Sequence, residues 1–191
     1  SEYEGNLFYK NATGNFVVET LVTLGTASSR TTTPTLQDSY AQGGFVIRDP
    51  ASAAHVQRWI MYNLGFQDNA VAREIKTTIP SADGTSDSLS TLHLNNTPSS
   101  ANTGRLRVCR LGSEFHFFHI HPGEADWVEE TFRSSGGAPT RVFGNGPKPA
   151  RADNSVLSFS RPDMATTVQV GLYVGNYATP PNGTRGDFDY I

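Results

Sequence analysis

Four segments of the chain alternate apolar and polar residues with a period of two. They are Gly44–Arg48, Arg105–Arg110, Glu114–His121 and Thr167–Val174. Because successive side chains of a β-strand point to opposite faces of the sheet, this pattern predicts strands with one face in a core. The opposite positions carry arginine, glutamate, histidine and aromatic residues rather than only Ser, Thr and Lys, which indicates a face that contacts a ligand.

Length and composition favour one all-β unit. A chain of 191 residues exceeds a typical domain, but all-β sandwiches reach this size as one unit, so we expect a single domain over residues 1–191. Charged residues make up only 17 %, while the 18 glycines and 11 prolines favour strands joined by turns and long polar loops. We therefore expect few helices.

Charge and hydropathy exclude several classes of partner. The formal net charge of −3 and the absence of a Lys/Arg run argue against nucleic acid. Apolar runs are too short to cross a bilayer, and the charged opening Ser1–Glu4 is not a signal peptide. The chain is expected to be either cytosolic or a mature or excised fragment, and its lone Cys109 forms no internal disulfide.

Weaker patterns place further strands and loops. We expect strands at Phe16–Leu24, Val56–Leu64, Val71–Ile79, Trp127–Arg133 and Asp187–Ile191. Leu111-Gly112-Ser113 fits a hairpin connection with a left-handed glycine. Two polar stretches, Ser81–Gly104 and Ser134–Ser155, are predicted to be long loops.

Strand parity assigns side chains to faces, since one step along a strand changes the side. The predicted core face carries Phe45, Ile47, Leu106, Val108, Phe115, Phe117, Val168, Val170 and Leu172. The opposite face then displays Arg48, Arg105, Arg107, His116, Phe118, Gln169 and Tyr173, joined from neighbouring strands by Glu74, Trp127 and Glu129.

This mixture of planar donors, acceptors and rings suits a sugar, which offers C–H bonds to an aromatic face and hydroxyls to bidentate side chains. The predicted stacking residues are Trp59, Tyr62, Trp127 and Tyr173. The predicted hydrogen-bonding residues are Arg48, Glu74, Arg107, His116, Glu129 and Gln169. Alternatively, Arg48/Glu74 and Arg107/Glu129 are cross-strand ion pairs that solubilise the sheet.

Three constellations could carry other chemistry. His119 and His121 form an i, i+2 pair able to chelate a transition metal, with strand-end packing as the alternative. Glu124-Ala-Asp126-Trp-Val-Glu129 matches the E-x-D-x-x-E spacing of laminarinase-type glycosidases, which need both carboxyls on one strand face. At the C-terminal strand, Asp187 and Asp189 could help to hold a structural calcium ion, or could act as edge-strand charges.

The order of several motifs resembles a known family. The series runs Gly14-Asn-Phe-Val-Val-Glu-Thr20, Gly43-Gly-Phe-Val-Ile-Arg-Asp49, Arg105-Leu-Arg-Val-Cys-Arg110, Trp127, Val168-Gln-Val-Gly-Leu-Tyr-Val174 and Gly186-Asp-Phe-Asp-Tyr190. It is similar to the concanavalin A-like lectin/glucanase superfamily, within it to domains of secreted bacterial carbohydrate-active proteins. The resemblance implies a two-sheet antiparallel jelly roll whose concave sheet carries Arg48, Glu74, Arg107 and Trp127.

These expectations converge on a non-catalytic, extracellular carbohydrate-binding module. We expect it to be attached to a larger carbohydrate-active protein and to have a glycan as its partner. The first alternative is a glycoside hydrolase or polysaccharide lyase of the laminarinase-like type, using Glu124 and Glu129 or the pair Glu74 and Glu129. The second is a structural or adhesion domain that meets a protein partner through its long loops.

Overall fold

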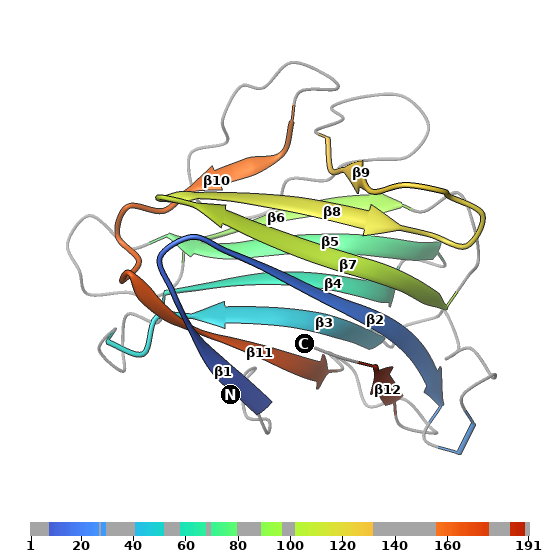
Figure 1. Ribbon diagram of the computed structural model, residues 1–191. Coiled ribbons are helices and arrows are strands. Elements are labelled where there is room, and N and C mark those ends of the chain that lie inside the picture. The colour runs from blue at the N-terminus through green and yellow to red at the C-terminus, as the bar shows by residue number, and fades with distance from the viewer. Residues whose placement is uncertain are drawn as a thin grey trace.

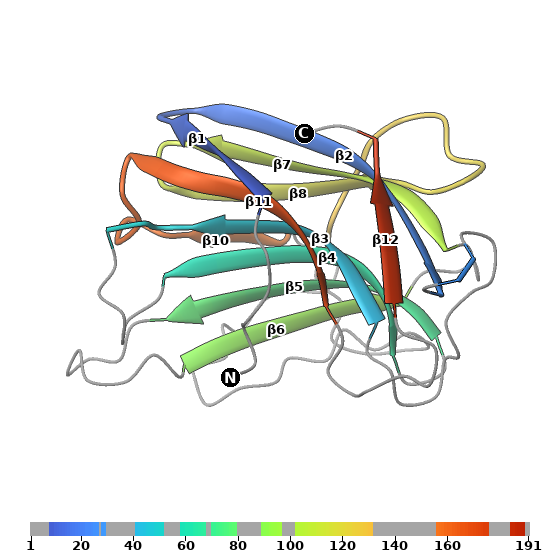
Figure 2. The same ribbon diagram turned by 90° about the horizontal axis from the view of Figure 1, so that it is seen from below.

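Residues 8–26, 28–29, 41–51, 58–67, 70–79, 89–96, 102–131, 156–175 and 184–189 are described by the computed structural model. Within these ranges the regular elements are all strands, and they form two antiparallel sheets packed face to face (Figures 1 and 2). The predicted all-β jelly-roll sandwich is therefore confirmed. In the same ranges no segment is a helix of the length and hydropathy needed to span a bilayer.

The first sheet, called sheet A, has six strands. In spatial order they are β1 (Phe8–Thr13), β11 (Thr167–Gly175), β3 (Ala41–Arg48), β4 (Trp59–Gln67), β5 (Ala70–Ile79) and β6 (Leu89–Asn96). Every neighbouring pair is antiparallel, and the first and eleventh strands of the chain lie side by side at one edge.

The second sheet, called sheet B, packs over it (Figure 2). Its order is β10 (Ser158–Ser160), β8 (Glu114–Ile120), β7 (Thr103–Leu111), β2 (Phe16–Thr26) and β12 (Thr184–Phe188), with the short β9 (Val128–Glu129) also paired to β8. Buried and accessible residues alternate along β7 and β8, as the period-two pattern predicts.

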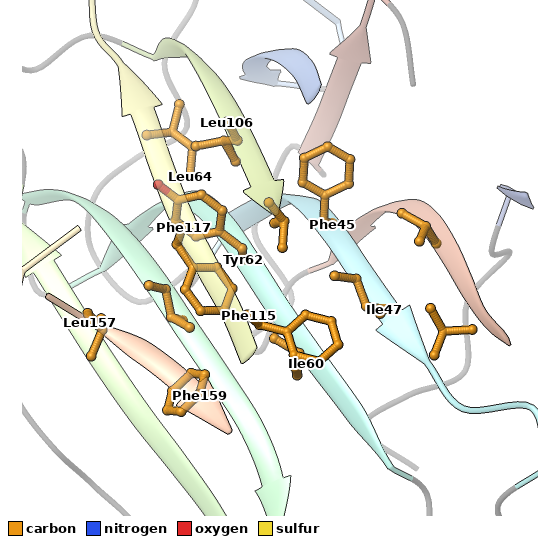
Figure 3. Packing of buried hydrophobic residues seen from close by; sticks show 14 of the residues in the cluster. Phe45, Ile47, Ile60, Tyr62, Leu64, Leu106, Phe115, Phe117, Leu157 and Phe159 are labelled. Atoms are coloured by element: carbon orange, nitrogen blue, oxygen red, sulfur yellow. The ribbon is translucent and has the colours of Figure 1, made fainter. Parts of the chain in front are cut away.

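The apolar core lies between the sheets and confirms the predicted face assignment. Phe45, Ile60 and Tyr62 of sheet A meet Phe115 and Phe117 of sheet B (Figure 3). The rings of Tyr62 and Phe117 contact edge to face at 5.4 Å, an arrangement that aromatic pairs prefer. Of the nine residues assigned to the core face, Leu172 alone is only partly buried; the other eight are buried.

Two turns are specified by their local sequence. Leu111 pairs with Glu114, so Gly112 and Ser113 connect β7 to β8, and Gly112 has the predicted left-handed backbone with φ of 61°. After β8, Pro122 and Gly123 form a second turn, with φ of 97° at the glycine.

Several predicted boundaries were wrong. The stretch expected to be a loop at Ser81–Gly104 contains strand β6, because pairing with β5 supplies backbone partners that a polar sequence does not reveal. Strands β1 and β10 were not predicted. Of the strand expected at Trp127–Arg133, the described residues 127–131 form β9 at Val128–Glu129 and an isolated bridge at Thr131. The last strand is Thr184–Phe188 rather than Asp187–Ile191, and residues 134–155 lie outside the described residues.

Candidate functional site

The predicted binding residues do not share one face. Arg48, Trp59, Glu74, Gln169 and Tyr173 lie on the outer face of sheet A, opposite to the core. Arg107, His116, Trp127 and Glu129, with Arg105 and Phe118, belong to the other side of the sandwich, at sheet B. The expectation of a single ligand face was therefore wrong. Parity fixes the side of a residue's own strand, whereas the sheet that the strand joins depends on distant pairing.

Tyr62 lies on neither outer face. Its side chain is fully buried in the core, and its hydroxyl donates to Glu130 Oε1 at 2.7 Å and is 3.2 Å from the carbonyl of Phe118. A buried ring cannot stack on a sugar, so the predicted stacking role was wrong for Tyr62, and also for Trp59, which is 5 % exposed. Burial, followed by the Glu130 charge, raises the pKa of the Tyr62 hydroxyl well above its usual value.

On the outer face of sheet A, one row of side chains is joined through Gln42. Backbone pairing aligns Tyr173, Gly44, Asn63 and Glu74 across four strands. The Gln42 amide donates to Glu74 Oε2, while its Oε1 accepts from Asn63 Nδ2 at 3.1 Å and from the Tyr173 hydroxyl at 3.5 Å. Glycine is required between Tyr173 and Asn63, because a Cβ on Gly44 would collide with the carbonyl oxygen of Tyr62.

This row, called the Gln42 row, is buried although it faces away from the core. Asn63 is 0 % exposed and Glu74 is 7 % exposed. The Oδ1 atom of Asn63 is buried without a hydrogen-bond partner among the described residues. Burial raises the pKa of Glu74, against the opposing effects of Lys76 and Gln42, and burial together with the Glu74 charge raises that of Tyr173. The Gln42 row therefore consists of hydrogen-bonding groups that are shielded from water, and Asn63 Oδ1 is an unpaired acceptor among the described residues.

A second row on the same face contains a guanidinium and an indole. Arg48 donates through Nε and Nη2 to Gln169 Oε1, at 3.2 and 2.8 Å, and its backbone pairs with that of Trp59. Lys76 Nζ lies 5.7 Å from the centre of the Trp59 ring. The alternative ion pair of Arg48 with Glu74 is not formed: Glu74 instead accepts from Gln42.

The outer face of sheet B carries a separate group of half-buried charges. Arg107 donates to Glu19 Oε1 at 2.8 Å through Nε, and its guanidinium lies 3.8 Å from the centre of the Trp127 ring. His116 Nδ1 is 2.9 Å from Glu129 Oε1. The alternative pair of Arg107 with Glu129 is thus replaced by two others, Arg107 with Glu19 and His116 with Glu129.

The predicted catalytic carboxylates are not arranged as a pair. Glu124 lies in the turn after β8 and accepts from the backbone N–H of His121 at 2.6 Å, whereas Glu129 is in β9 and faces His116. Glu74 is on the far side of the sandwich from Glu129. Neither combination has the shared strand face that the hydrolase hypothesis requires.

A polar cluster that sequence reasoning missed lies at one end of the core. The Arg73 guanidinium binds both oxygens of Glu130, and its Nη1 also bonds to His121 Nε2. His119 Nδ1 lies 2.9 Å from the same carboxylate. Burial alone would raise the pKa of Glu130, but Arg73 and His119 hold it well below its usual range. Nothing in the local sequence distinguishes Glu130 from Glu129, since only the fold turns one inward.

The predicted metal-chelating pair belongs to this cluster. His119 and His121 share a buried face, with ring centres 5.0 Å apart, as their spacing predicts. In the described part of the chain, however, no three histidine, cysteine or acidic side chains gather in a way that could hold a metal ion. The Arg73 guanidinium beside His121 also disfavours a cation there.

Comparisons with known proteins give distant structural likenesses. No family model and no curated protein matches the chain. A functionally unknown protein from Saccharomyces cerevisiae is similar with a TM-score of 0.49 at 12 % identity, covering 96 % of this chain and 73 % of that one. The GH43 protein BlXynB from Bacillus licheniformis gives 0.46 at 16 % identity, covering 90 % of this chain and 26 % of that one. A glycoside hydrolase family protein from Mycobacterium thermorestibile gives 0.40 at 14 %, with 93 % and 65 % covered. Likenesses at this level do not establish a shared function.

Proposed function

We propose that the outer face of sheet A binds a carbohydrate chain without cleaving it. The observation that carries this proposal is the Gln42 row, in which the half-buried Gln42 is held by Glu74 and Asn63 and accepts from the half-buried Tyr173. The accessible groups of Gln42 and Tyr173 can bond to ligand hydroxyls, while Asn63 and Glu74, which are 0 % and 7 % exposed, fix their positions.

The chemistry of the rest of the face supports the same class of ligand. The amide oxygen and nitrogen of Gln42 can exchange hydrogen bonds with vicinal hydroxyls, which both donate and accept. The half-buried Arg48 and Tyr173 flank these groups and present a planar cation and a ring. The sequence resemblance to the concanavalin A-like superfamily supports a glycan ligand, together with an extracellular location and attachment to a larger carbohydrate-active protein.

The absence of bond cleavage is proposed from the carboxylate arrangement. Retaining hydrolysis needs two carboxyl groups about 5–5.5 Å apart, and inverting hydrolysis needs about 6.5–9.5 Å. The Gln42 row contains the carboxylate of Glu74. In the pairs Glu124 with Glu129 and Glu74 with Glu129, the two carboxylates belong to different elements and do not share a strand face. Structural calcium at Asp187 and Asp189 remains a proposal that this binding does not require.

Isothermal titration with soluble β-glucan, xylan, mannan and uronate oligosaccharides tests the proposal. We expect one of these to bind with modest affinity, and Glu74→Gln to weaken it at least tenfold because the carboxylate that holds the Gln42 amide is lost. Trp127→Ala is the matched control on sheet B and should leave the affinity unchanged. If the folded protein gives no heat with any of these glycans, the proposal is wrong. Release of reducing ends from a bound glycan would contradict its non-catalytic part.

A further inference from the structure

The outer face of sheet A carries more positive than negative charge at its accessible positions. Strand pairing places three charged residues of the six strands on this face: Arg48, Glu74 and Lys76. Both cations are half-buried, whereas Glu74 is 7 % exposed. The chain as a whole has a formal net charge of −3. A locally cationic face on an acidic protein indicates a ligand that carries negative charge.

The charges of β5 on this face offset each other. Glu74 and Lys76 are two residues apart and therefore lie on the same side of the strand. Burial raises the pKa of Glu74, and the positive charge of Lys76 opposes this shift because it favours the ionised carboxylate. The charge of Lys76 is thus partly compensated within the protein, and Arg48 is the other cation of the face.

Arg48 has a neutral partner. Its Nε and Nη2 donate to the amide oxygen of Gln169, at 3.2 and 2.8 Å, and Gln169 lies directly opposite on the neighbouring strand β11 (Figure 2). Among the described residues no carboxylate forms an ion pair with Arg48. The adjacent Asp49 is 3.7 Å from Arg58 and accepts from the backbone N–H of Ala51. The Arg48 charge is therefore held in place without being neutralised.

The two bonds to Gln169 leave the end of the guanidinium available. A guanidinium has five N–H donors in one plane, and the Gln169 oxygen accepts from the edge formed by Nε and Nη2. Nη1 and the second N–H of Nη2 then point outward as a parallel pair. The two oxygens of a carboxylate match such a pair, whereas two separate hydroxyls would be needed to fill it.

The distance along β3 separates this guanidinium from the Gln42 row. Arg48 and Gly44 are four residues apart, which corresponds to about 13 Å in an extended strand. A single sugar ring is shorter than this, so a ligand that contacts both places is a chain of several sugars. Glu74 lies two strands further across the sheet, beyond the Debye length of about 10 Å at 0.1 M salt, and its charge does not prevent an anion from binding at Arg48.

We propose that the carbohydrate bound by this face is an acidic polysaccharide, in which a uronate carboxylate accepts from Nη1 and Nη2 of Arg48 while another part of the chain contacts the Gln42 row. This inference rests on the function proposed above and adds the chemical class of the ligand. A half-buried charge without an opposite partner costs free energy, and the ligand carboxylate reduces that cost.

Isothermal titration with matched acidic and neutral ligands tests the inference. Oligogalacturonate, oligomannuronate and oligoglucuronate are each compared with the neutral oligosaccharide obtained from them by carboxyl reduction, which keeps the linkage and the number of rings. We expect at least one uronate to bind at least tenfold more tightly than its reduced form, with an advantage that shrinks as the salt concentration rises. A sulfated sample of the reduced oligosaccharide distinguishes a carboxylate from a sulfate ester, and tighter binding of the sulfated sample than of the uronate would overturn the assignment.

Two arginine variants show whether the guanidinium of this face makes the selection. Arg48→Gln should make the affinities for the uronate and its reduced form equal, whereas Arg105→Gln, which removes an exposed cation from sheet B, should leave their ratio unchanged. The ratio is used because a loss of folded protein would affect both ligands alike. Equal effects of the two variants would overturn the inference, since net charge would then select the acid.

The outcome also separates this inference from the function on which it rests. If a neutral glycan binds and no uronate binds more tightly than its reduced form, the inference is wrong and the proposed carbohydrate binding stands. If neither acidic nor neutral glycans bind to the folded protein, both are wrong.

Discussion

Two arginine–glutamate pairs in this molecule have the same chemistry and opposite surroundings. Arg73 and Glu130 meet at the end of the core, where their side chains are 8 % and 1 % exposed. Arg107 and Glu19 meet on the outer face of sheet B, where the corresponding values are 26 % and 32 %. Both pairs join residues far apart in the chain, so the difference between them comes from burial alone.

The comparison shows what burial changes in an ion pair. At the surface, water screens the charges and can replace either partner, so such a pair contributes about 0–1 kcal/mol. In the interior an unpaired charge is strongly destabilising. The Glu130 carboxylate is accordingly contacted by Arg73, Tyr62 and His119. The buried pair is thus the centre of a hydrogen-bonded network, while beside the surface pair Arg107 stacks on Trp127.

The largest expected effect is that of breaking the buried pair. Arg73→Met should lower the free energy of unfolding by about 3–5 kcal/mol, because Glu130 would remain as an uncompensated buried charge. Urea denaturation at pH 7 measures this loss, with Arg107→Met as the surface control. The double variant Arg73→Met/Glu130→Gln should recover part of the stability. Equal losses for the two arginine variants would show that the pairs do not differ as described.

The next effect is a loss of stability in acid. The pKa of His121 in the folded protein is about 4, below its ordinary value of 6.5. Between pH 6.5 and 4 this imidazole is therefore protonated in the unfolded chain and neutral in the folded protein. Stability is therefore complete above about pH 6.5 and falls by about 2–3 kcal/mol as the pH approaches 4. Urea midpoints between pH 7 and 4.5 measure the slope, which His121→Gln should flatten. A flat profile in the wild type would contradict this assignment.

A smaller effect is expected from removing one hydroxyl of the buried network. Tyr62→Phe deletes the donor that lies 2.7 Å from Glu130 Oε1 and should cost about 1–2 kcal/mol, since the ring still fills the core. Calorimetric unfolding compares it with Tyr173→Phe, whose hydroxyl makes a longer contact of 3.5 Å to Gln42. The interpretation fails if Tyr173→Phe is the more destabilising of the two.

The smallest effect is expected at the surface pair. Glu19→Gln should change the free energy of unfolding by less than about 1 kcal/mol, because Arg107 keeps its stacking on Trp127 and regains water. Any difference should shrink further in 1 M salt, where the Debye length is only about 3 Å. A loss comparable to that of Arg73→Met, unaffected by salt, would remove the contrast between the two pairs.

The candidate site was only partly accessible to sequence reasoning. Alternation placed Arg48 and Gln169 on the outer side of their strands correctly, and the structure joins them. The same rule placed Arg107 on an outer side, but of the other sheet. Period-two patterning is a property of one strand and its backbone, so it does not predict which sheet that strand joins.

The residues that the sequence analysis did not identify were missed for one common reason. Asn63 and Gln42 are ordinary polar residues in the sequence, and they matter because pairing across three strands brings them to Glu74. Glu130 follows a residue of the same type, and it faces inward because its backbone N–H bonds to the carbonyl of Phe117, a core residue of β8. Local sequence propensities do not predict these contacts, because the contacts form only when distant segments of the chain pack together.

By itself the sequence determined the local properties of this protein: strands with an apolar side and the glycine turn at Gly112. The tertiary structure decided which strands pair, which sheet each polar side chain faces, and which charges are buried. Arg73 and Glu130 stand 57 residues apart, and only the packing of two sheets brings them together and removes their water. The strength of a charge pair depends on that removal, which is why its consequences could not be predicted from the order of residues.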